Sequence, residues 1–142
     1  MLADTLKKVI ADSYVLYFKA HTFHWNVEGT DFAQYHGFLG DFYEDVFDSI
    51  DTYSELIRTL DEYAPISLKG LINMSSLEEP TGIPDGLTML KDLKRDNDLY
   101  ITQLLKAYDE AEKESEIGVS NFLQDRIQAH EKHSWMLRSF AR

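Results

Sequence analysis

All three prolines of this 142-residue chain lie in one short stretch, at positions 65, 80 and 84. Proline interrupts a helix because it lacks an N–H group and its ring clashes with the preceding turn. The residues on either side of this stretch are therefore free to form long helices, and their apolar side chains recur at helical spacing. The pattern predicts an all-α chain with one irregular connection near its middle.

The first half of the chain predicts two long helices joined by a tight turn. Apolar residues at helical spacing run from position 2 to about position 27. Gly29 is a typical helix stop, and Thr30 or Asp31 can cap the next helix. That second helix is expected over residues 32–60 and is roughly 40 Å long at the usual helical rise.

The second half predicts two more helices, preceded by a connector with a short amphipathic turn around residues 67–72. Pro84 fits the first position of a helix over residues 84–114, where its missing N–H is not needed. Gly118 is expected to break the chain, and Ser120 to cap a last helix that ends near Phe140. The apolar side of the third long helix is expected to carry Leu87, Leu90, Leu93, Ile101, Leu104 and Leu105.

The lengths of the three connections predict how the helices are arranged. Two tight breaks and one long crossover, between the second and third long helices, give an up-down-down-up four-helix bundle. A single long crossover is typical of the ferritin-like arrangement, here with a short helix inside the connection. We expect residues 1–142 to form a single domain of this kind.

Composition excludes several classes of function. The chain has no cysteine, so it forms no disulfide and no thiolate metal site. No stretch approaches the roughly 20 apolar residues of a membrane span, and the beginning of the chain lacks a signal-peptide pattern, so a cytoplasmic location is expected. The net charge of −11 disfavours nucleic acid as a partner and suits the attraction of cations.

One face of the second predicted helix is strongly acidic. Successive residues of a helix turn by about 100°, which places His36 within about 80° of this face. Like charges one turn apart repel one another, and a bound cation would remove that cost. A solvated acidic surface is the alternative interpretation, but the same helix also carries many aromatic and aliphatic residues. The carboxylates of this face are Glu44, Asp48, Asp51 and Glu55.

Histidines supply the other half of a candidate metal site. His21 and His24 lie one turn apart on the first helix, and imidazole with carboxylate suits iron, manganese or zinc better than copper(I). A di-iron bundle folded from one chain uses Glu-x-x-His on two helices, and this chain contains no such motif. A site inside one bundle is therefore incomplete, and a two-fold partner can supply the missing ligands.

Two segments carry a resemblance to a known family. Residues 21–36 read HTFHWNVEGTDFAQYH, and residues 48–60 read DSIDTYSELIRTL. Together they resemble the Dps family of mini-ferritins, and the likeness continues through the connector to DRIQAHEKHSWMLRSF in the last helix. It covers nearly the whole chain. The residues that match the family pattern are His24, Trp25, Asn26, Gly29, Phe32, His36, Asp51 and Glu55.

The resemblance implies a homo-dodecameric cage with a ferroxidase centre at each two-fold interface. One subunit would supply His24 and His36, and its neighbour Asp51 and Glu55. Members of the family oxidise iron(II), typically with hydrogen peroxide in preference to oxygen, and store ferric mineral inside the cage. The chain is thus expected to be an iron-binding ferroxidase that protects against oxidative stress, with one or two irons per site.

Gly40 departs from the family pattern, which usually has an aspartate four residues after the second histidine. Asp41 stands one residue late, about 100° further round the helix. Three outcomes stay open: a local distortion brings Asp41 to the second iron, Glu44 or Asp48 reaches it, or it is weakly held. The last two are favoured over the first. Gly40 also raises a rival function, a structural or metal-buffering cage that has lost its activity.

Two neighbouring residues are expected to support the site. His21 is expected to orient a ligand or to be structural, and Trp25 is expected to pack beside the iron, although packing alone explains it. His130 and His133 are expected to serve helix packing or surface contacts. Strong DNA binding is not expected, because twelve copies would carry a charge near −130 and no lysine-rich tail precedes the first helix.

Overall fold

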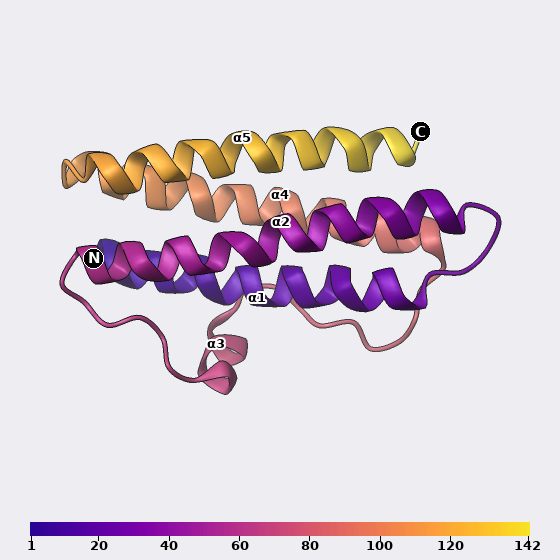
Figure 1. The fold of residues 1–142 in the computed structure, drawn as a ribbon, viewed down its shortest axis with the longest axis horizontal. Coiled ribbons are helices and arrows are strands. Elements are labelled where there is room, and N and C mark those ends of the chain that lie inside the picture. Colours follow the sequence, from indigo (N-terminus) through magenta and orange to yellow (C-terminus); the bar gives the residue numbers. More distant parts are fainter.

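The computed structural model describes residues 1–142 and contains helices but no strands. Four long helices form a bundle, and a fifth, short helix lies in the long connection (Figure 1). The predicted all-α, ferritin-like four-helix bundle with a short helix between the second and third long helices is confirmed. The elements are α1 (Leu2–Asn26), α2 (Phe32–Thr59), α3 (Leu68–Met74), α4 (Gly86–Lys113) and α5 (Ile117–Phe140).

The long helices pack as two hairpins, α1 with α2 and α4 with α5. The hairpins meet mainly through α1 and α4, whereas α2 and α5 touch at few points. The connection from α2 to α4 runs along the outer side of α1, so α3 lies against α1 and away from α5 (Figure 1). None of these helices is long and apolar enough to span a bilayer.

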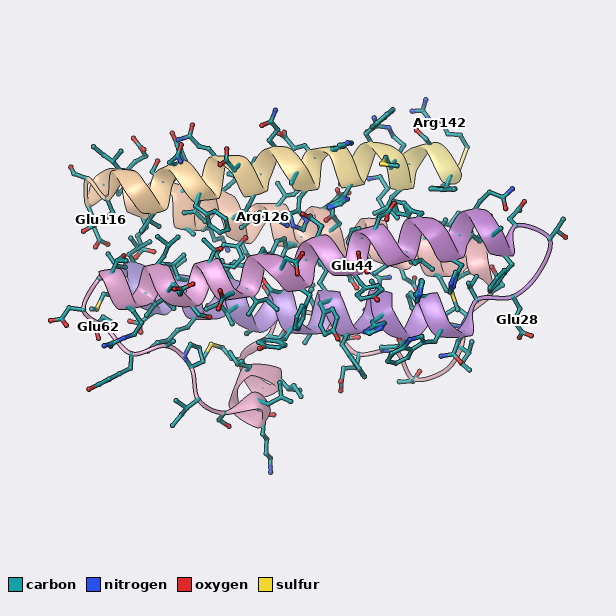
Figure 2. All side chains as sticks on the ribbon, in the orientation of Figure 1. Glu28, Glu44, Glu62, Glu116, Arg126 and Arg142 are labelled. Atoms are coloured by element: carbon teal, nitrogen blue, oxygen red, sulfur yellow. The ribbon has the colours of Figure 1, made fainter.

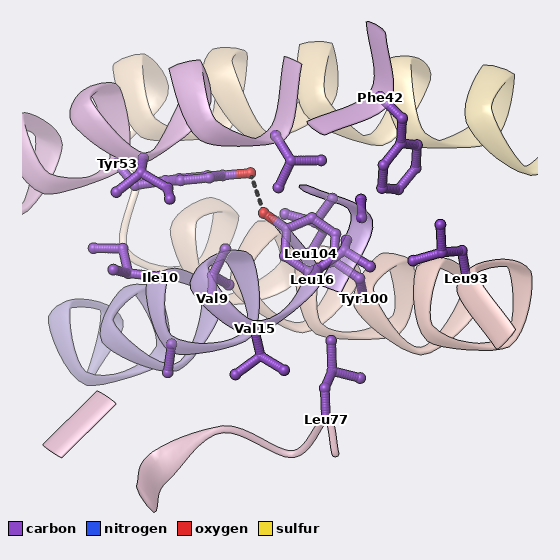
Figure 3. Packing of buried hydrophobic residues seen from close by; sticks show 14 of the residues in the cluster. Val9, Ile10, Val15, Leu16, Phe42, Tyr53, Leu77, Leu93, Tyr100 and Leu104 are labelled. Carbon is purple, nitrogen blue, oxygen red and sulfur yellow. Dashed lines mark hydrogen bonds between the residues drawn. The ribbon is translucent and has the colours of Figure 1, made fainter. Parts of the chain in front are cut away.

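The centre of the bundle combines aliphatic packing with a small polar chain. Tyr53 of α2 and Tyr100 of α4 are both fully buried, and Tyr100 donates a hydrogen bond to the Tyr53 hydroxyl at 3.0 Å (Figure 3). Ser13 of α1 shares a 2.6 Å hydrogen bond with Tyr100. Pairing satisfies hydroxyls that would otherwise be costly to bury, so three helices are held in register at this level.

Two carboxylates, one on α4 and one on α1 itself, tie α1 to the rest of the fold. Lys19 forms a buried ion pair with Asp96 of α4, with 2.5 Å between the charged atoms. Asp12 accepts hydrogen bonds from the side chain of Ser75 and from the backbone N–H of Ser76, just after α3. The long connection is therefore anchored to α1, the helix that carries two of the candidate histidines.

Three predicted helix boundaries are wrong. Gly118 lies inside α5 and Ser120 donates to Glu112 instead of capping, because the chain reverses earlier, at Ser115. Ser115 has a φ of 57°. Its N–H donates to the carbonyl of Glu112 and the next N–H donates to the carbonyl of Ala111, which together form a Schellman motif. Pro84 precedes α4 by two residues, since the side chain of Asp85 caps the helix by accepting from Thr88.

The predicted apolar side of α4 is only partly correct. Leu90, Leu93 and Leu104 are fully buried. Leu87 and Leu105 are exposed, because they lie at the edges of the stripe that faces α1 and α5. Periodicity thus identified the buried face but not its width.

Candidate metal site

His24 of α1 and His36 of α2 lie face to face at the α1–α2 hairpin. Their rings stack with centroids 3.7 Å apart, and each Nδ1 lies 2.7 Å from the backbone carbonyl oxygen of the other residue. A carbonyl oxygen only accepts hydrogen bonds, so both Nδ1 atoms carry hydrogen. In the neutral rings the lone pairs are then on the Nε2 atoms, which are free to bind a metal.

Gly40 contributes to this arrangement by having no side chain. A Cβ atom at this position would lie 3.1 Å from Cε1 of His24 and 3.4 Å from its Nδ1. The His24 ring therefore packs against the backbone at position 40 and would have to shift slightly to admit a side chain there. Gly40 stands where the family usually has an aspartate. Its effect on the site is therefore not only the loss of a carboxylate, because the glycine also contacts the candidate ligand His24.

His21 belongs to an aromatic cluster beside the histidine pair. The His21 ring stacks on the Tyr43 ring, with centroids 3.9 Å apart, and its centroid lies 4.0 Å from that of Trp25. The Nδ1 atom of His21 forms a 3.0 Å hydrogen bond with the hydroxyl of Tyr17. Burial and the nearby His24 lower its pKa, so the ring is neutral at pH 7. Trp25 is 56% exposed, which leaves its outer edge uncovered by this chain.

Asp51 and Glu55 lie one turn apart on the exposed side of α2. A hydrogen bond with Asp51, together with the charge of Asp51, raises the pKa of Glu55. The two carboxylates therefore compete to hold negative charge, and a bound cation would relieve this competition. The other predicted candidates on α2, Asp41, Glu44 and Asp48, are likewise exposed.

The histidine pair and the carboxylate pair are separated within the chain. His36 and Asp51 are fifteen positions apart on α2, which is about 22 Å along the helix. Consistent with this distance, no three metal-binding side chains converge within one chain. Each chain thus presents two half-sites on the same side of α2, one with two imidazoles and one with two carboxylates.

A second polar cluster was not predicted as a unit. Arg126 of α5 points toward α2 (Figure 2) and donates to both oxygens of Asp45, at 3.0 and 2.9 Å. His133 donates from Nε2 to Asp45 at 2.7 Å. Burial alone would raise the pKa of Asp45, but the hydrogen bonds from His133 and Arg126 hold it well below its usual range. This cluster is the main polar tie between α2 and α5.

His130 is fully buried within that cluster. Its Nδ1 donates to the side-chain oxygen of Asn97 at 2.6 Å, and its Nε2 accepts from Arg126 at 2.8 Å. Burial, with the charge of Arg126, lowers its pKa far below the usual value. Both nitrogens are therefore occupied, and the predicted packing role of His130 is confirmed.

Comparison with known proteins identifies the family. The model of the ferritin-like domain family matches residues 3–142. A low temperature-induced protein of Nostoc is 34% identical to this chain, over 96% of this chain and 78% of its own length. The DNA protection during starvation protein of Brevibacillus brevis is 30% identical, over 99% of this chain and 94% of its own length.

A solved structure gives the same answer. The Dps protein of Vibrio cholerae is described as a member of a broad superfamily of ferritin-like diiron-carboxylate proteins. Its structure superimposes on this one with a TM-score of 0.95 at 27% identity, over 99% of this chain and 89% of its own. The likeness therefore extends over the whole bundle and includes the α1–α2 hairpin that carries the histidines. This chain belongs to the Dps family of ferritin-like proteins.

Proposed function

We propose that this chain is an iron(II)-oxidising and iron-storing cage protein whose oxidation sites form between two subunits. The observation that supports it best is the reciprocal hydrogen bonding of His24 and His36, which leaves two Nε2 lone pairs side by side. Membership of a ferritin-like family associated with diiron-carboxylate chemistry supports iron as the substrate. The homo-dodecameric cage is part of this proposal.

The ligand set follows from the two half-sites. His24 and His36 of one copy bind iron(II) through Nε2, and Asp51 and Glu55 of a second copy supply the oxygen ligands. Imidazole with carboxylate, without sulfur, suits iron in this oxidation state. Glu44 and Asp48 are the nearest further oxygen donors along the acidic face of α2. Asp41 is a weaker candidate, because it lies about 100° from Gly40.

The residues around the ligands have separate tasks. The two backbone carbonyls hold the imidazole rings in the tautomer that can bind iron. His21 stays neutral and supports Trp25 and Tyr43 beside the pair. When hydrogen peroxide is the oxidant, two iron(II) ions each lose one electron, the O–O bond breaks, and two protons are taken up to form two waters.

The first test compares iron(II) oxidation by stoichiometric hydrogen peroxide in the native protein and in an Asp51→Asn/Glu55→Gln variant of the same assembly size. We expect fast oxidation by the native protein and a rate near that of buffer for the variant. A double variant at two exposed carboxylates on other helices, Asp109→Asn/Glu131→Gln, is the matched control. Equal rates in native and Asp51/Glu55 variant proteins would contradict the proposal.

Complementation tests whether the site is shared. Neither a His24→Ala/His36→Ala protein nor the Asp51→Asn/Glu55→Gln protein has an intact site. In a mixed two-fold dimer, however, one of the two sites receives both native halves. Co-expression of the two variants in equal amounts should therefore restore roughly a quarter of the native rate. Activity that does not return in the mixture would place all ligands within one chain.

Gly40 favours one rival function. Because glycine has no side chain, position 40 supplies no oxygen ligand to a second iron. A cage that binds one metal ion per site and oxidises it slowly would act as a metal buffer or a structural protein. Tight iron binding without accelerated oxidation in the first test would support this rival.

A further inference from the structure

A buried positive charge lies inside the bundle, among side chains that the proposed function does not use. The side chain of Arg126 on α5 is only 9% exposed and points toward α2 (Figure 2). Its Nη2 atom donates to Oδ2 of Asp45 at 2.9 Å and to Nε2 of His130 at 2.8 Å. One atom of the guanidinium group is thus held by a carboxylate of α2 and by an imidazole lone pair of α5.

The acceptors around this atom belong to a set that commonly binds metals. His130 and His133 lie one turn apart on α5, and Nε2 of His133 is 2.7 Å from the same Asp45 oxygen that Nη2 contacts. Two imidazoles with one carboxylate are typical ligands of zinc and of iron(II). These three side chains belong to one chain, unlike the two halves of the proposed shared site.

His130 is already oriented in the way that a metal-bound histidine is. Its Nδ1 atom donates to Oδ1 of Asn97 at 2.6 Å, and the amide nitrogen of Asn97 donates to the Ser134 hydroxyl at 2.8 Å. These bonds fix the tautomer of His130, so its Nε2 lone pair points at Arg126. A polar partner on the second ring nitrogen is the usual support of a metal-ligating histidine.

The guanidinium group does not match this surrounding completely. The Nε atom of Arg126 is buried and has no hydrogen-bond partner, and a buried donor that stays unpaired costs free energy. The acceptors therefore serve the two terminal nitrogens and leave the third unpaired. Their arrangement suits a compact cation at the position of Nη2 as well as it suits the planar group.

Arginine places a permanent positive charge at this position. A guanidinium group stays protonated throughout the physiological pH range, and like charges a few Å apart repel strongly where water is excluded. A metal ion therefore has no access to Asp45 and the two histidines while Arg126 is present, and no three metal-binding side chains converge in the native chain. In a di-iron bundle folded from one chain, by contrast, the metal lies between the helices of that bundle.

We propose that Arg126 takes the place of a metal ion inside the bundle and keeps divalent cations out of it. Loss of the arginine would open a metal site with Asp45, His130 and His133 as its ligands. Bonds to such a metal are about 2.0–2.2 Å long, so the ligand atoms would close in by roughly 0.7 Å from their hydrogen-bonded positions. His133 would also move its hydrogen from Nε2 to Nδ1. The inference goes beyond the proposed function, because it concerns the interior of a single chain.

Cobalt(II) is a suitable probe, because its visible absorption reports the geometry of its ligands. Every variant carries His24→Ala/His36→Ala, which removes the imidazole half-site at the hairpin. In this background Arg126→Ala should bind about one cobalt(II) per chain in a tetrahedral site with strong visible bands. Arg126→Lys, which keeps a positive charge, is the matched control, and neither it nor the protein that retains Arg126 should show these bands.

Two further measurements assign the ligands. Asp45→Asn, added to Arg126→Ala, should weaken cobalt(II) binding at least about tenfold, because a neutral amide replaces the carboxylate. Cobalt(II) should also raise the unfolding temperature of Arg126→Ala but not that of Arg126→Lys, since a ligand that binds only the folded state stabilises it.

Cobalt(II) binding by Arg126→Ala no greater than that by Arg126→Lys would overturn the inference and leave Arg126 as a structural tie between α2 and α5. If Arg126→Ala does not fold without metal, the inference requires that cobalt(II) restore its helical circular dichroism. A chain that stays unfolded in excess cobalt(II) would equally overturn it. Because the shared site is absent from every variant, these results do not depend on whether the native protein oxidises iron(II).

Discussion

The molecule contains two pairs of histidines that differ in what their nitrogens do. His24 and His36 are half-buried at the α1–α2 hairpin, and each uses Nδ1 to bond a backbone carbonyl. His130 and His133 lie between α2, α4 and α5, and their Nε2 atoms are already bonded to Arg126 and Asp45. His24 and His36 thus keep their Nε2 lone pairs side by side, whereas both nitrogens of His130 are occupied and the Nε2 of His133 is held by Asp45.

The difference teaches that a histidine is defined by its hydrogen-bond partners. A backbone carbonyl holds one nitrogen and leaves the other free, which is typical of metal ligands. In His130, by contrast, Arg126 and Asn97 occupy both ring nitrogens, so the residue has a structural role. The two pairs should therefore respond in opposite ways to the same substitution.

The largest effect is expected for His130→Phe. The substitution removes both side-chain hydrogen bonds of His130 and leaves the Oδ1 atom of Asn97 buried without a donor. We expect a cost of about 2–4 kcal/mol in the free energy of unfolding. Urea or thermal unfolding of the assembled protein measures the loss. Binding of cobalt(II), followed by visible absorption, should be unchanged. A shift in stability below about 1 kcal/mol would show that the network contributes little.

The pH dependence of stability should come from the same network. The pKa of His130 is lowered in the folded state, so the unfolded chain binds the additional proton below about pH 6.5. The free energy of unfolding therefore decreases as the pH is lowered, by up to about 1.4 kcal/mol per pH unit. Because the pKa of Asp45 is also lowered, its contribution is present above about pH 4 and is lost below it.

Thermal unfolding between pH 7.5 and 3 checks these directions. The slope below pH 6.5 should flatten in His130→Phe, apart from a smaller contribution of His21, whose pKa is also lowered. An Asp45→Asn variant should flatten the curve only below about pH 4. Parallel curves for the native and His130→Phe proteins would contradict the assignment of the slope to His130.

His36→Phe is the matched substitution in the other pair. It removes one hydrogen bond to a carbonyl near the end of α1, so the expected cost is below about 1 kcal/mol. Cobalt(II) binding should fall at least tenfold, because one of the two imidazole ligands is lost. Comparable stability losses for His36→Phe and His130→Phe would remove the distinction between the two pairs.

The smallest effect on stability is expected for Gly40→Ala. Alanine favours the helix by about 1 kcal/mol, but its Cβ would lie 3.1 Å from the His24 ring, and moving that ring costs a similar amount. The free energy of unfolding should change by only a few tenths of a kcal/mol, while the affinity for cobalt(II) should decrease. Gly37→Ala, at a position where a Cβ meets nothing, is the control and should only stabilise.

Local sequence features were sufficient to predict the helices. Apolar periodicity and the three prolines gave α1, α2 and the connection, because these signals act within a few residues. The end of α4 was predicted at the right place, but the break was assigned to Gly118. Ser115 takes the left-handed conformation instead, since the Schellman hydrogen bonds stabilise a residue other than glycine there.

The candidate site was predicted as residue types but not as geometry. The positions of His24, His36, Asp51 and Glu55 came from spacing and from resemblance to a family. Their availability depends on contacts that spacing does not reveal, such as the His24 ring against Gly40. The Asp45–Arg126 pair was missed because its members are 81 residues apart and neither carries a local motif.

The sequence by itself determined that the chain is helical, where its acidic face lies, and that no single bundle holds a complete metal site. These properties depend on periodicity, charge and motif, which are readable along the chain. Only the tertiary structure decided which histidine nitrogens are free, because tautomers depend on partners from other helices. It also decided that the His24 ring packs against Gly40, since this contact joins residues of two different helices.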